Sequence, residues 1–511
     1  MKFIVGDAAV LQNQTNGPAF FLLRDRWDDW GKYRTQFYLY AFDSSGKRHA
    51  IGEVKIGQRG LKPSGVVAEG QRAPSLPDFF ESLPEAFFSL GQTESYYEEL
   101  NTLPADLKSH VLHGLRDIAF DLNLLKEFKD EDVTNESLLR NVRIENVTGR
   151  LHRLSLGDAT LTAFDFSFSV PGMTVDASED DGVSFSVVPE STPPTNVHAI
   201  IGRNGVGKTK FIQNIVSSVL NTDSPSVGST QLRKNHENWG FTGIISVSFS
   251  AFDDLDFPRN SNSGTPVNFV GLRDQASDGE LKTKTPSQLN EEFVECLKRC
   301  FTGVKRDRWR ATTLGLYGDP VFADANPLKL LDASSSELDE AASDYFKRLS
   351  SGHKIVLLTV TKLVDLVAEK TLILLDEPEG HLHPPLLSAL VRSVSTLLSS
   401  RNGVAIIATH SPVVLQEVPR DCTWIIHRSG RNSNAERPEI ETFAENVSVL
   451  TRQVFGLEVT HTGFMKMIQD AVNSSHSYEQ IIQHFGGKLG TEGRLIARGL
   501  IATRDKSGTS T

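Results

Sequence analysis

The chain has 511 residues, with 53 Lys or Arg against 64 Asp or Glu, which gives a formal net charge of −11. This length predicts more than one domain, and the acidic balance excludes a protein whose whole surface coats nucleic acid. Three cysteines exclude a disulfide framework and a cysteine-rich zinc module. Asp7 stands where a signal-peptide core would begin, and no apolar run approaches the ~20 residues that span a bilayer. We therefore expect a soluble cytoplasmic protein without membrane contact.

The first 135 residues predict an α+β appendage. Residues 36–51 read as a hairpin around the turn 43–46, because turn residues there separate aromatic and apolar runs. Six apolar residues then recur every three or four positions, which predicts one helix face packed on a core: Leu107, Val111, Leu115, Ile118, Leu122 and Leu125. Alternating runs at 164–170 and 183–187 predict a second hairpin, with its turn at 178–182.

A phosphate-binding loop follows a short apolar strand at 197–201 and precedes a helical pattern at 211–220. The pattern G-x-x-x-x-G-K-[ST] in this setting binds nucleotide phosphates through backbone N–H groups and the positive end of the helix. Lys208 is predicted to reach the β and γ phosphates of ATP, and the Thr209 hydroxyl to ligate Mg²⁺. The predicted nucleotide-binding residues of this loop are Gly202, Arg203, Asn204, Gly205, Val206, Gly207, Lys208, Thr209 and Lys210.

A buried-strand run at 371–375 ends in two carboxylates with distinct predicted roles. Asp376 is expected to hold the Mg²⁺ shell, and Glu377 to polarise the water that attacks the γ-phosphate. The histidines that follow, His381 and His383, suggest a Zn²⁺ site with Glu377. Because a third certain ligand is missing, we favour a turn that lies against a neighbouring subunit, followed by a helix.

Two further segments complete the predicted machinery. Ser350, Ser351 and Gly352 stand at the start of an amphipathic helix, where hydroxyl and N–H donors face outward from a positive dipole end. A second buried strand, 404–408, leads to His410, which is placed to sense the γ-phosphate at a strand end. Glu377, His410 and Lys208 are the predicted catalytic residues.

The order of these segments resembles the ABC-type ATPases over roughly residues 140–430. The run from Asp376 to Pro384 resembles the SMC-, RecF- and OLD-like branch, which implies an α/β P-loop head with a mixed sheet. The branch also implies two heads that sandwich ATP, with Ser350–Gly352 of one head over the nucleotide of the other. The signature reads Leu-Ser-Ser-Gly-His, and no glutamine follows the strand 244–249, so Ser250 or Asp253 is the candidate substitute.

The resemblance extends to the ATPase subunits of Septu and Septu-like retron anti-phage systems, on the strand 248–253 and the tail 445–494. These act with a separate HNH nuclease, and in retrons also with a reverse transcriptase and its RNA–DNA hybrid. No Asp-x-Asp pair follows His410, so we expect no nuclease within the chain itself. An ATP-locked scaffold with negligible hydrolysis and a RecF-like DNA clamp stay open as alternatives.

The expected organisation is an appendage at 1–135, an ABC-type head at 136–430 with a helical insertion at about 255–348, and a helical tail at 431–511 for partner contact. One basic cluster could contact nucleic acid, with Trp309 stacking on bases, although a solvated helix face is the commoner explanation. Its residues are Lys298, Arg299, Lys305, Arg306, Arg308 and Arg310. Cys296 and Cys300, in the same stretch, are expected to serve packing.

Overall fold

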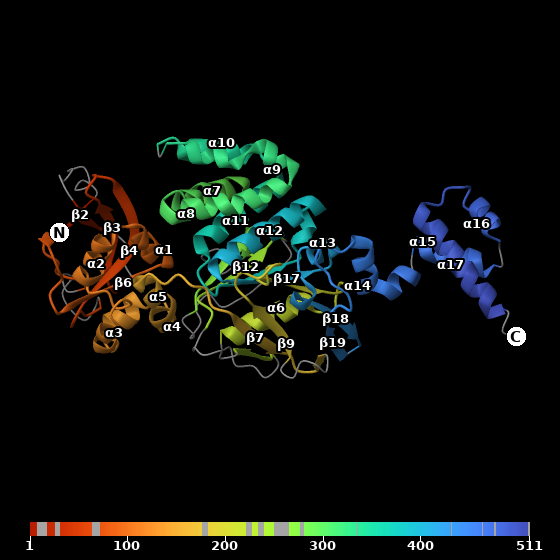
Figure 1. Cartoon of the computed structure of the whole chain (residues 1–511), viewed down its shortest axis with the longest axis horizontal. Coiled ribbons are helices and arrows are strands. Elements are labelled where there is room, and N and C mark those ends of the chain that lie inside the picture. Colours follow the sequence, from red (N-terminus) through yellow and green to blue (C-terminus); the bar gives the residue numbers. More distant parts are fainter. Residues whose placement is uncertain are drawn as a thin grey trace.

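The computed structural model describes residues 1–7, 18–25, 31–63, 72–175, 182–220, 227–232, 240–249, 265–275, 281–334, 336–430, 432–461, 463–474 and 477–508. Two large sheets organise these residues, one close to the N-terminus and one in the centre, and helices α15–α17 form a separate group at the C-terminal end (Figure 1). Within the described ranges, every helix is too short or too polar to cross a bilayer.

The N-terminal sheet has six strands in the order β5-β1-β2-β3-β4-β6. Its strands are β1 (Phe3–Gly6), β2 (Ala19–Arg24), β3 (Gln36–Phe42), β4 (Arg48–Gln58), β5 (Phe79–Phe80) and β6 (Phe87–Gly91). β3 and β4 pair in antiparallel register around the turn at 43–46, which confirms the first predicted hairpin. Asp43 holds this turn, because its carboxylate accepts from the backbone N–H groups of Ser45 and Lys47.

The apolar stripe from Leu107 to Leu125 forms two helices where the sequence predicts one. The chain forms α1 (Glu94–Thr102), α2 (Ala105–Gly114), α3 (Leu122–Phe128), α4 (Ile144–Asn146) and α5 (His152–Leu156). After α2 the backbone turns at Arg116, with φ +52°, and the buried Asp117 carboxylate accepts from the N–H groups of Ala119 and Phe120. These local bonds replace helical ones, so the single predicted helix is wrong; five of its six apolar residues are buried and Leu122 is partly buried.

The hydrophobic core of this N-terminal part extends past the expected boundary at residue 135. Val147, Leu151 and Leu154 are buried in the same cluster as the strands of the six-stranded sheet. A network of ion pairs then joins this part to the central one. Arg401, 3% exposed, pairs with Glu94 and Glu98. Glu369 pairs with Arg150 at 2.9 Å and with Arg153 at 3.2 Å.

The central sheet has eight strands in the order β13-β12-β16-β17-β10-β18-β19-β8. Its six strands from β13 to β18 pair in parallel, whereas β19 pairs antiparallel to β18, so the sheet is mixed as predicted. The strands are β8 (Met173–Val175), β10 (Val197–Ile201), β12 (Ile244–Ser248), β13 (Val267–Gly271), β16 (Leu372–Asp376), β17 (Val404–Thr409), β18 (Thr423–Ser429) and β19 (Asn432–Glu436).

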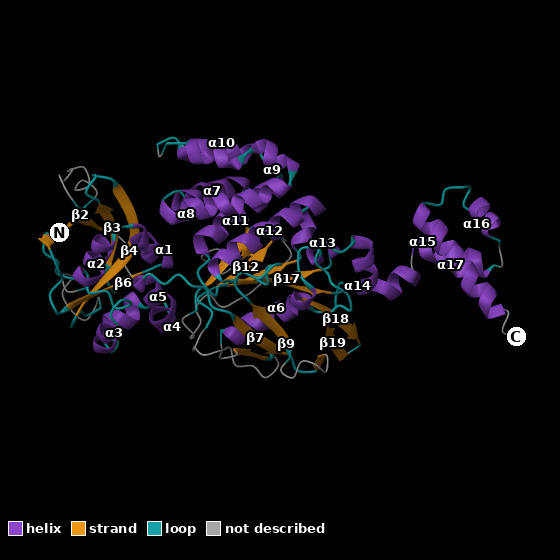
Figure 2. Cartoon of the chain, viewed as in Figure 1, coloured by secondary structure: helices purple, strands orange, loops and turns teal. Residues whose placement is uncertain are grey.

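Each face of this sheet has its own core. A small antiparallel sheet of β7 (Phe164–Ser169), β9 (Val183–Val187) and β11 (Ser229–Leu232), together with α6 (Lys208–Val219), covers one face. The pairing of β7 with β9 confirms the second predicted hairpin, and most of its expected turn, residues 178–181, lies outside the described residues. The other face is covered by helices, including α7 (Pro286–Cys300), α8 (Gly303–Leu314), α11 (Ser351–Leu366) and α12 (Pro384–Arg401) (Figure 2).

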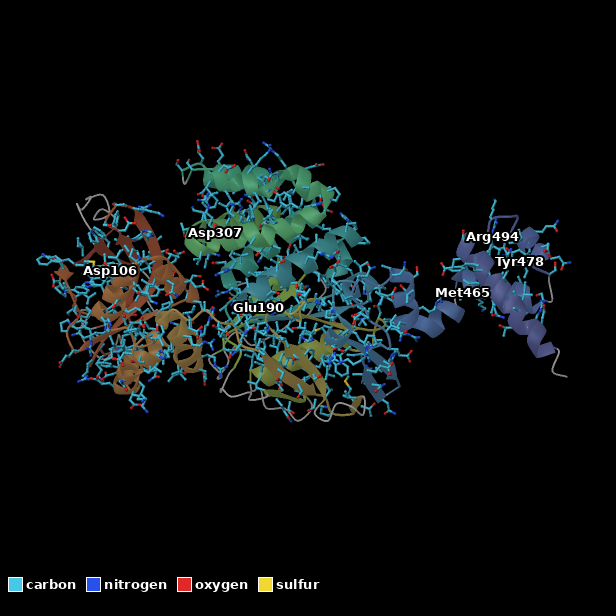
Figure 3. All side chains as sticks on the ribbon, in the orientation of Figure 1. Asp106, Glu190, Asp307, Met465, Tyr478 and Arg494 are labelled. Atoms are coloured by element: carbon cyan, nitrogen blue, oxygen red, sulfur yellow. The ribbon has the colours of Figure 1, made fainter. Side chains whose placement is uncertain are left out.

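The expected insertion and tail are less uniformly helical than their sequences suggest. Three strands of the insertion, β13, β14 (Arg273–Gln275) and β15 (Leu281–Thr283), precede its helices, which include α9 (Pro320–Ala325) and α10 (Leu338–Arg348). Strand β19 lies inside the expected tail. Helix α13 (Pro412–Leu415) precedes the tail, between β17 and β18. After β19 the chain forms α14 (Val447–His461), α15 (Gly463–Asn473), α16 (Tyr478–His484) and α17 (Thr491–Gly508). Met465, Tyr478 and Arg494 mark this last group in Figure 3.

Candidate nucleotide-binding site

Three neighbouring strands bring the predicted functional residues to one edge of the central sheet. β17 lies between β10 and β16, with Ile201 opposite Thr409 and Asp376 opposite Ala408. Because the carboxyl ends of parallel strands meet at the same edge, the phosphate loop, His410 and the pair of carboxylates converge there. The predicted strands are confirmed, and the roles of the residues at their ends stay predictions.

The phosphate loop is closed by its own lysine. Lys208 is the first residue of α6 and is 3% exposed; its Nζ donates to the carbonyl oxygens of Gly202 and Arg203, both at 3.1 Å. Gly205 and Gly207 have φ values of +81° and +103°, which favour glycine, and a Cβ at either position would meet no atom within 4 Å. The loop therefore presents open space bordered by backbone N–H groups and a buried ammonium.

Two carboxylates stand at the end of β16, and that of Glu377 lies against this loop. Asp376 is 4% exposed, and the Oε1 of Glu377 lies 3.4 Å from Lys208 Nζ and 3.9 Å from His410 Nδ1. Glu377 has φ +41°, a conformation that costs energy for a residue with a side chain and is often found at functional sites. Its backbone N–H donates to Ala408 O at 2.9 Å, which ties the turn to the neighbouring strand.

Glu379 is a functional candidate that the sequence interpretation left without a role. Its Oε1 accepts from the Thr409 hydroxyl at 2.7 Å and from the His410 N–H at 2.6 Å, and it lies 3.1 Å from His410 Nδ1. The Glu379 side chain is 8% exposed, so these contacts at the end of β17 are buried. The sequence feature that could have pointed to Glu379 is its place in the run Asp-Glu-Pro-Glu, two residues after Glu377.

His198, on β10, is buried behind the loop. It is completely shielded from solvent and lies against the Phe185 ring, with centroids 5.3 Å apart, and its Nε2 is 3.2 Å from Ser186 O. Burial, and next the nearby positive charge of Arg437, lower the pKa of His198 to about 3. The strand that leads to the phosphate loop thus contains an imidazole that stays uncharged at neutral pH.

The signature residues lie against the segment that follows β16. Ser350 caps α11, and its Oγ is 2.6 Å from His353 Nδ1. Ser350 and Ser351 are exposed, and a Cβ at Gly352 would approach the carbonyl oxygen of His381 to 3.2 Å. The strand β12 ends at Ser248, and the proposed glutamine substitutes Ser250 and Asp253 lie outside the described residues.

The structure contradicts base stacking by Trp309, whereas nucleic-acid contact by the cations around it stays a prediction. Trp309 is fully buried and its Nε1 donates to Thr361 Oγ1 at 3.0 Å, so it offers no face to a base. Most of these cations have partners within the chain: on the surface Lys298 pairs with Asp339 and Arg306 donates to Leu331 O, and nearer the interior Arg299 and Lys305 pair with Asp365 and Arg308 with Glu98. Cys296 and Cys300 are buried, as expected of packing residues.

The residues at the sheet edge fit ATP with Mg²⁺. A triphosphate needs N–H donors and an ammonium around open space, which Gly202–Lys208 provide. A hydroxyl and a carboxylate, from Thr209 and Asp376, are ligands that Mg²⁺ prefers. When bound, the metal supplies positive charge to the phosphate oxygens.

A curated relative decides the family. Protein ea59 of Escherichia phage lambda is 39% identical over 515 residues, which covers 95% of this chain and 95% of the relative. The chain belongs to the family of phage lambda protein ea59. A family profile described as "AAA domain, putative AbiEii toxin, Type IV TA system" matches residues 320–416. With the phosphate loop, the profile match indicates an ATP-binding P-loop protein of the AAA type.

Solved structures show similarity at lower levels. An ATP-binding cassette of an ABC transporter, in its ADP conformation, is 15% identical, covers 59% of this chain and 99% of its own, and has a TM-score of 0.30. An SMC head bound to the C-terminal winged-helix domain of ScpA is 12% identical, with 54% and 96% covered and a TM-score of 0.25. Values this low support no conclusion about activity or partners.

Proposed function

We propose that the chain hydrolyses ATP at the edge formed by β10, β17 and β16. The observation that carries this proposal is the convergence of Lys208, Glu377 and His410, with Glu377 Oε1 within 3.4 Å of Lys208 Nζ and 3.9 Å of His410 Nδ1. Lys208 would release its two loop carbonyls and bind the β and γ phosphates instead. Thr209 and Asp376 would hold Mg²⁺ beside them.

In this proposal Glu377 is the group that orients and polarises the attacking water. Its carboxylate is 42% exposed, so water reaches it, and ion pairing with Lys208 keeps it at the loop. His410 would contact the γ-phosphate. Glu379 would position His410, because the Glu379 carboxylate accepts from the backbone N–H of His410. Lys208 stabilises the negative charge that moves onto the leaving phosphate.

We further propose that two copies close around ATP, with Ser350–Gly352 of one copy over the nucleotide of the other. The exposed hydroxyls of Ser350 and Ser351 at the N-terminus of α11 support this, because a helix N-terminus favours phosphate. ATP would then bind the closed dimer more tightly than the open one, so ATP binding would shift the equilibrium toward the closed dimer. Regulation of a separate HNH nuclease in anti-phage defence rests on the Septu-like resemblance of residues 248–253 and 445–494.

Three variants test the enzymatic proposal in the full-length chain. Lys208→Ala should abolish ATP binding, whereas Lys347→Ala, at a lysine that is 64% exposed, should bind ATP as the wild type does. Glu377→Gln should bind ATP, release no phosphate and accumulate a dimer in light scattering. Normal turnover by Lys208→Ala and Glu377→Gln would show that the site is wrongly assigned.

A scaffold that holds ATP without turning it over is the second candidate. The Ser350 hydroxyl lies 2.6 Å from His353 Nδ1 of its own chain. Because this contact occupies one hydrogen-bonding direction of the hydroxyl, Ser350 would contribute less to the binding of a phosphate on the other copy, and hydrolysis would be weaker. Phosphate release far below one turnover per hour, with ATP retained through purification, would select the scaffold. Turnover that rises with protein concentration would select the dimeric enzyme.

A further inference from the structure

A second group of potential metal ligands lies apart from the phosphate loop. Asp319 caps α9, His353 lies in the first turn of α11, and His383 caps α12. One ligand atom from each of these residues lies within 4.8 Å of the other two. His353 Nε2 is 3.1 Å from Asp319 Oδ1, and His383 Nε2 is 3.6 Å from Asp319 Oδ2.

The two oxygens of Asp319 have unequal surroundings. Oδ1 accepts from the backbone N–H groups of Val321 at 2.9 Å and Phe322 at 3.1 Å, so it serves as the helix cap. Oδ2 is buried and has no hydrogen-bond partner among the residues that the structure describes, because His383 Nε2 lies beyond bonding distance. The residue is 1% exposed, and a carboxylate oxygen without a partner at that depth is unfavourable. Oδ2 lies nearest to the His383 imidazole, whereas His353 contacts Oδ1.

The spacing suits a tetrahedral transition metal. Ligands at about 2.0–2.1 Å from a tetrahedral ion lie roughly 3.3 Å from one another. His353 Nε2 lies 3.1 Å from Oδ1 of Asp319, and His383 Nε2 lies 3.6 Å from Oδ2, the other oxygen of the same carboxylate. Ser350 Oγ lies 2.6 Å from His353 Nδ1, so it can accept the Nδ1 proton and leave Nε2 free for a metal. His383 is 51% exposed, which leaves the fourth position open to solvent.

An explanation without a metal also exists for these contacts. His353 and His383 could each donate an Nε2–H to Asp319, and a weak bond from Leu386 N–H to His383 Nδ1, at 3.4 Å, agrees with that tautomer. This explanation does not account for the distance of 3.6 Å between His383 Nε2 and Asp319 Oδ2, which is too long for a hydrogen bond. The two explanations predict different responses to added metal.

We propose that Asp319, His353 and His383 bind a divalent transition metal of the Zn²⁺ class. Two imidazoles and one carboxylate favour Zn²⁺ over Mg²⁺, which prefers oxygen ligands. The sequence suggested a site of His381, His383 and Glu377. In this proposal His383 instead binds the metal together with Asp319 and His353, which are 34 residues apart in the chain, and His381 takes no part. The metal would tie the signature helix α11 to the loop after β16, beside Ser350.

The test uses the full-length chain after treatment with a chelator. Zn²⁺ titrated by calorimetry should bind in a 1:1 ratio, and Co²⁺ should give the absorption bands of a tetrahedral site. His383→Ala and Asp319→Asn should lose this binding at least tenfold, and Asn retains the cap of α9. His381→Ala is the matched control, because His381 is exposed in the same loop outside the cluster.

Two outcomes would overturn the proposal. One is wild-type Zn²⁺ binding no tighter than that of Asp319→Asn, which would leave hydrogen bonds as the explanation. The other is an equal loss in His381→Ala and His383→Ala, which would show adventitious binding by surface histidines. Because the proposal does not depend on ATP hydrolysis, Lys208→Ala should keep the Zn²⁺ site even if it loses ATP. A rise in melting temperature with Zn²⁺ in wild type but not in His383→Ala supports the site independently.

Discussion

Acid should destabilise the central sheet through His198, a fully buried residue on β10. In the folded chain the pKa of His198 is lowered to about 3, first by burial and then by Arg437. In the unfolded chain an imidazole titrates at about 6.5. Between these values the unfolded state binds a proton that the folded state does not, so stability is full above the unfolded pKa and falls as the pH decreases through it.

The size of the effect follows from the two pKa values. From pH 7 to pH 5 the proton uptake of the unfolded imidazole removes about 2 kcal/mol of unfolding free energy, at about 1.4 kcal/mol per pH unit. His198→Gln removes the titrating group and keeps an N–H donor for Ser186 O. The variant will be less stable at pH 7, but its stability should fall by about 2 kcal/mol less over this interval.

Urea unfolding followed by tryptophan fluorescence measures this difference, since Trp424 is buried in the same core as Ile200 of β10. Comparing the change from pH 7 to pH 5 between wild type and variant cancels the titration of all other groups. His381→Gln, at an exposed position, should change with pH as the wild type does. The same pH dependence in His198→Gln and wild type would refute the burial of an uncharged imidazole at this position.

Two further substitutions probe packing and the loop. Arg401→Met should reduce the unfolding free energy by about 3 kcal/mol, because it removes the buried guanidinium between Glu94 and Glu98 and leaves them with Arg150 at 3.5 Å and Arg308 at 2.8 Å. The control Lys298→Met, at a lysine that is 51% exposed, should cost below about 1 kcal/mol. Equal effects of the two substitutions in urea unfolding would contradict the network. Gly207→Ala should lower the unfolding free energy by about 1–2 kcal/mol, because alanine is strained at this positive φ. It should also abolish ATP binding, since the new Cβ enters the space proposed for the phosphates. An unchanged affinity for ATP in calorimetric titration would contradict the proposed phosphate site.

Contiguous motifs were predictable from the sequence because their chemistry requires neighbouring residues. The Gly-rich loop must join a strand to a helix for its N–H groups to surround a phosphate, so the elements β10 and α6 followed directly from Gly202–Thr209. The same holds for the apolar strands that end at Asp376 and Thr409. The two hairpins also followed from alternation and turn residues.

Tertiary structure decided every feature that depends on which distant segments meet. The apolar period at 107–125 could not show that Asp117 would cap a new turn, and the cations near Trp309 could not show that Glu98 and Asp365 lie opposite them. His353 meets Asp319 because α11 and the start of α9 pack together, and Glu379 holds His410 because β16 and β17 are neighbours. A sequence by itself determines local periods and motifs, whereas packing free energy, summed over the whole core, determines such partners.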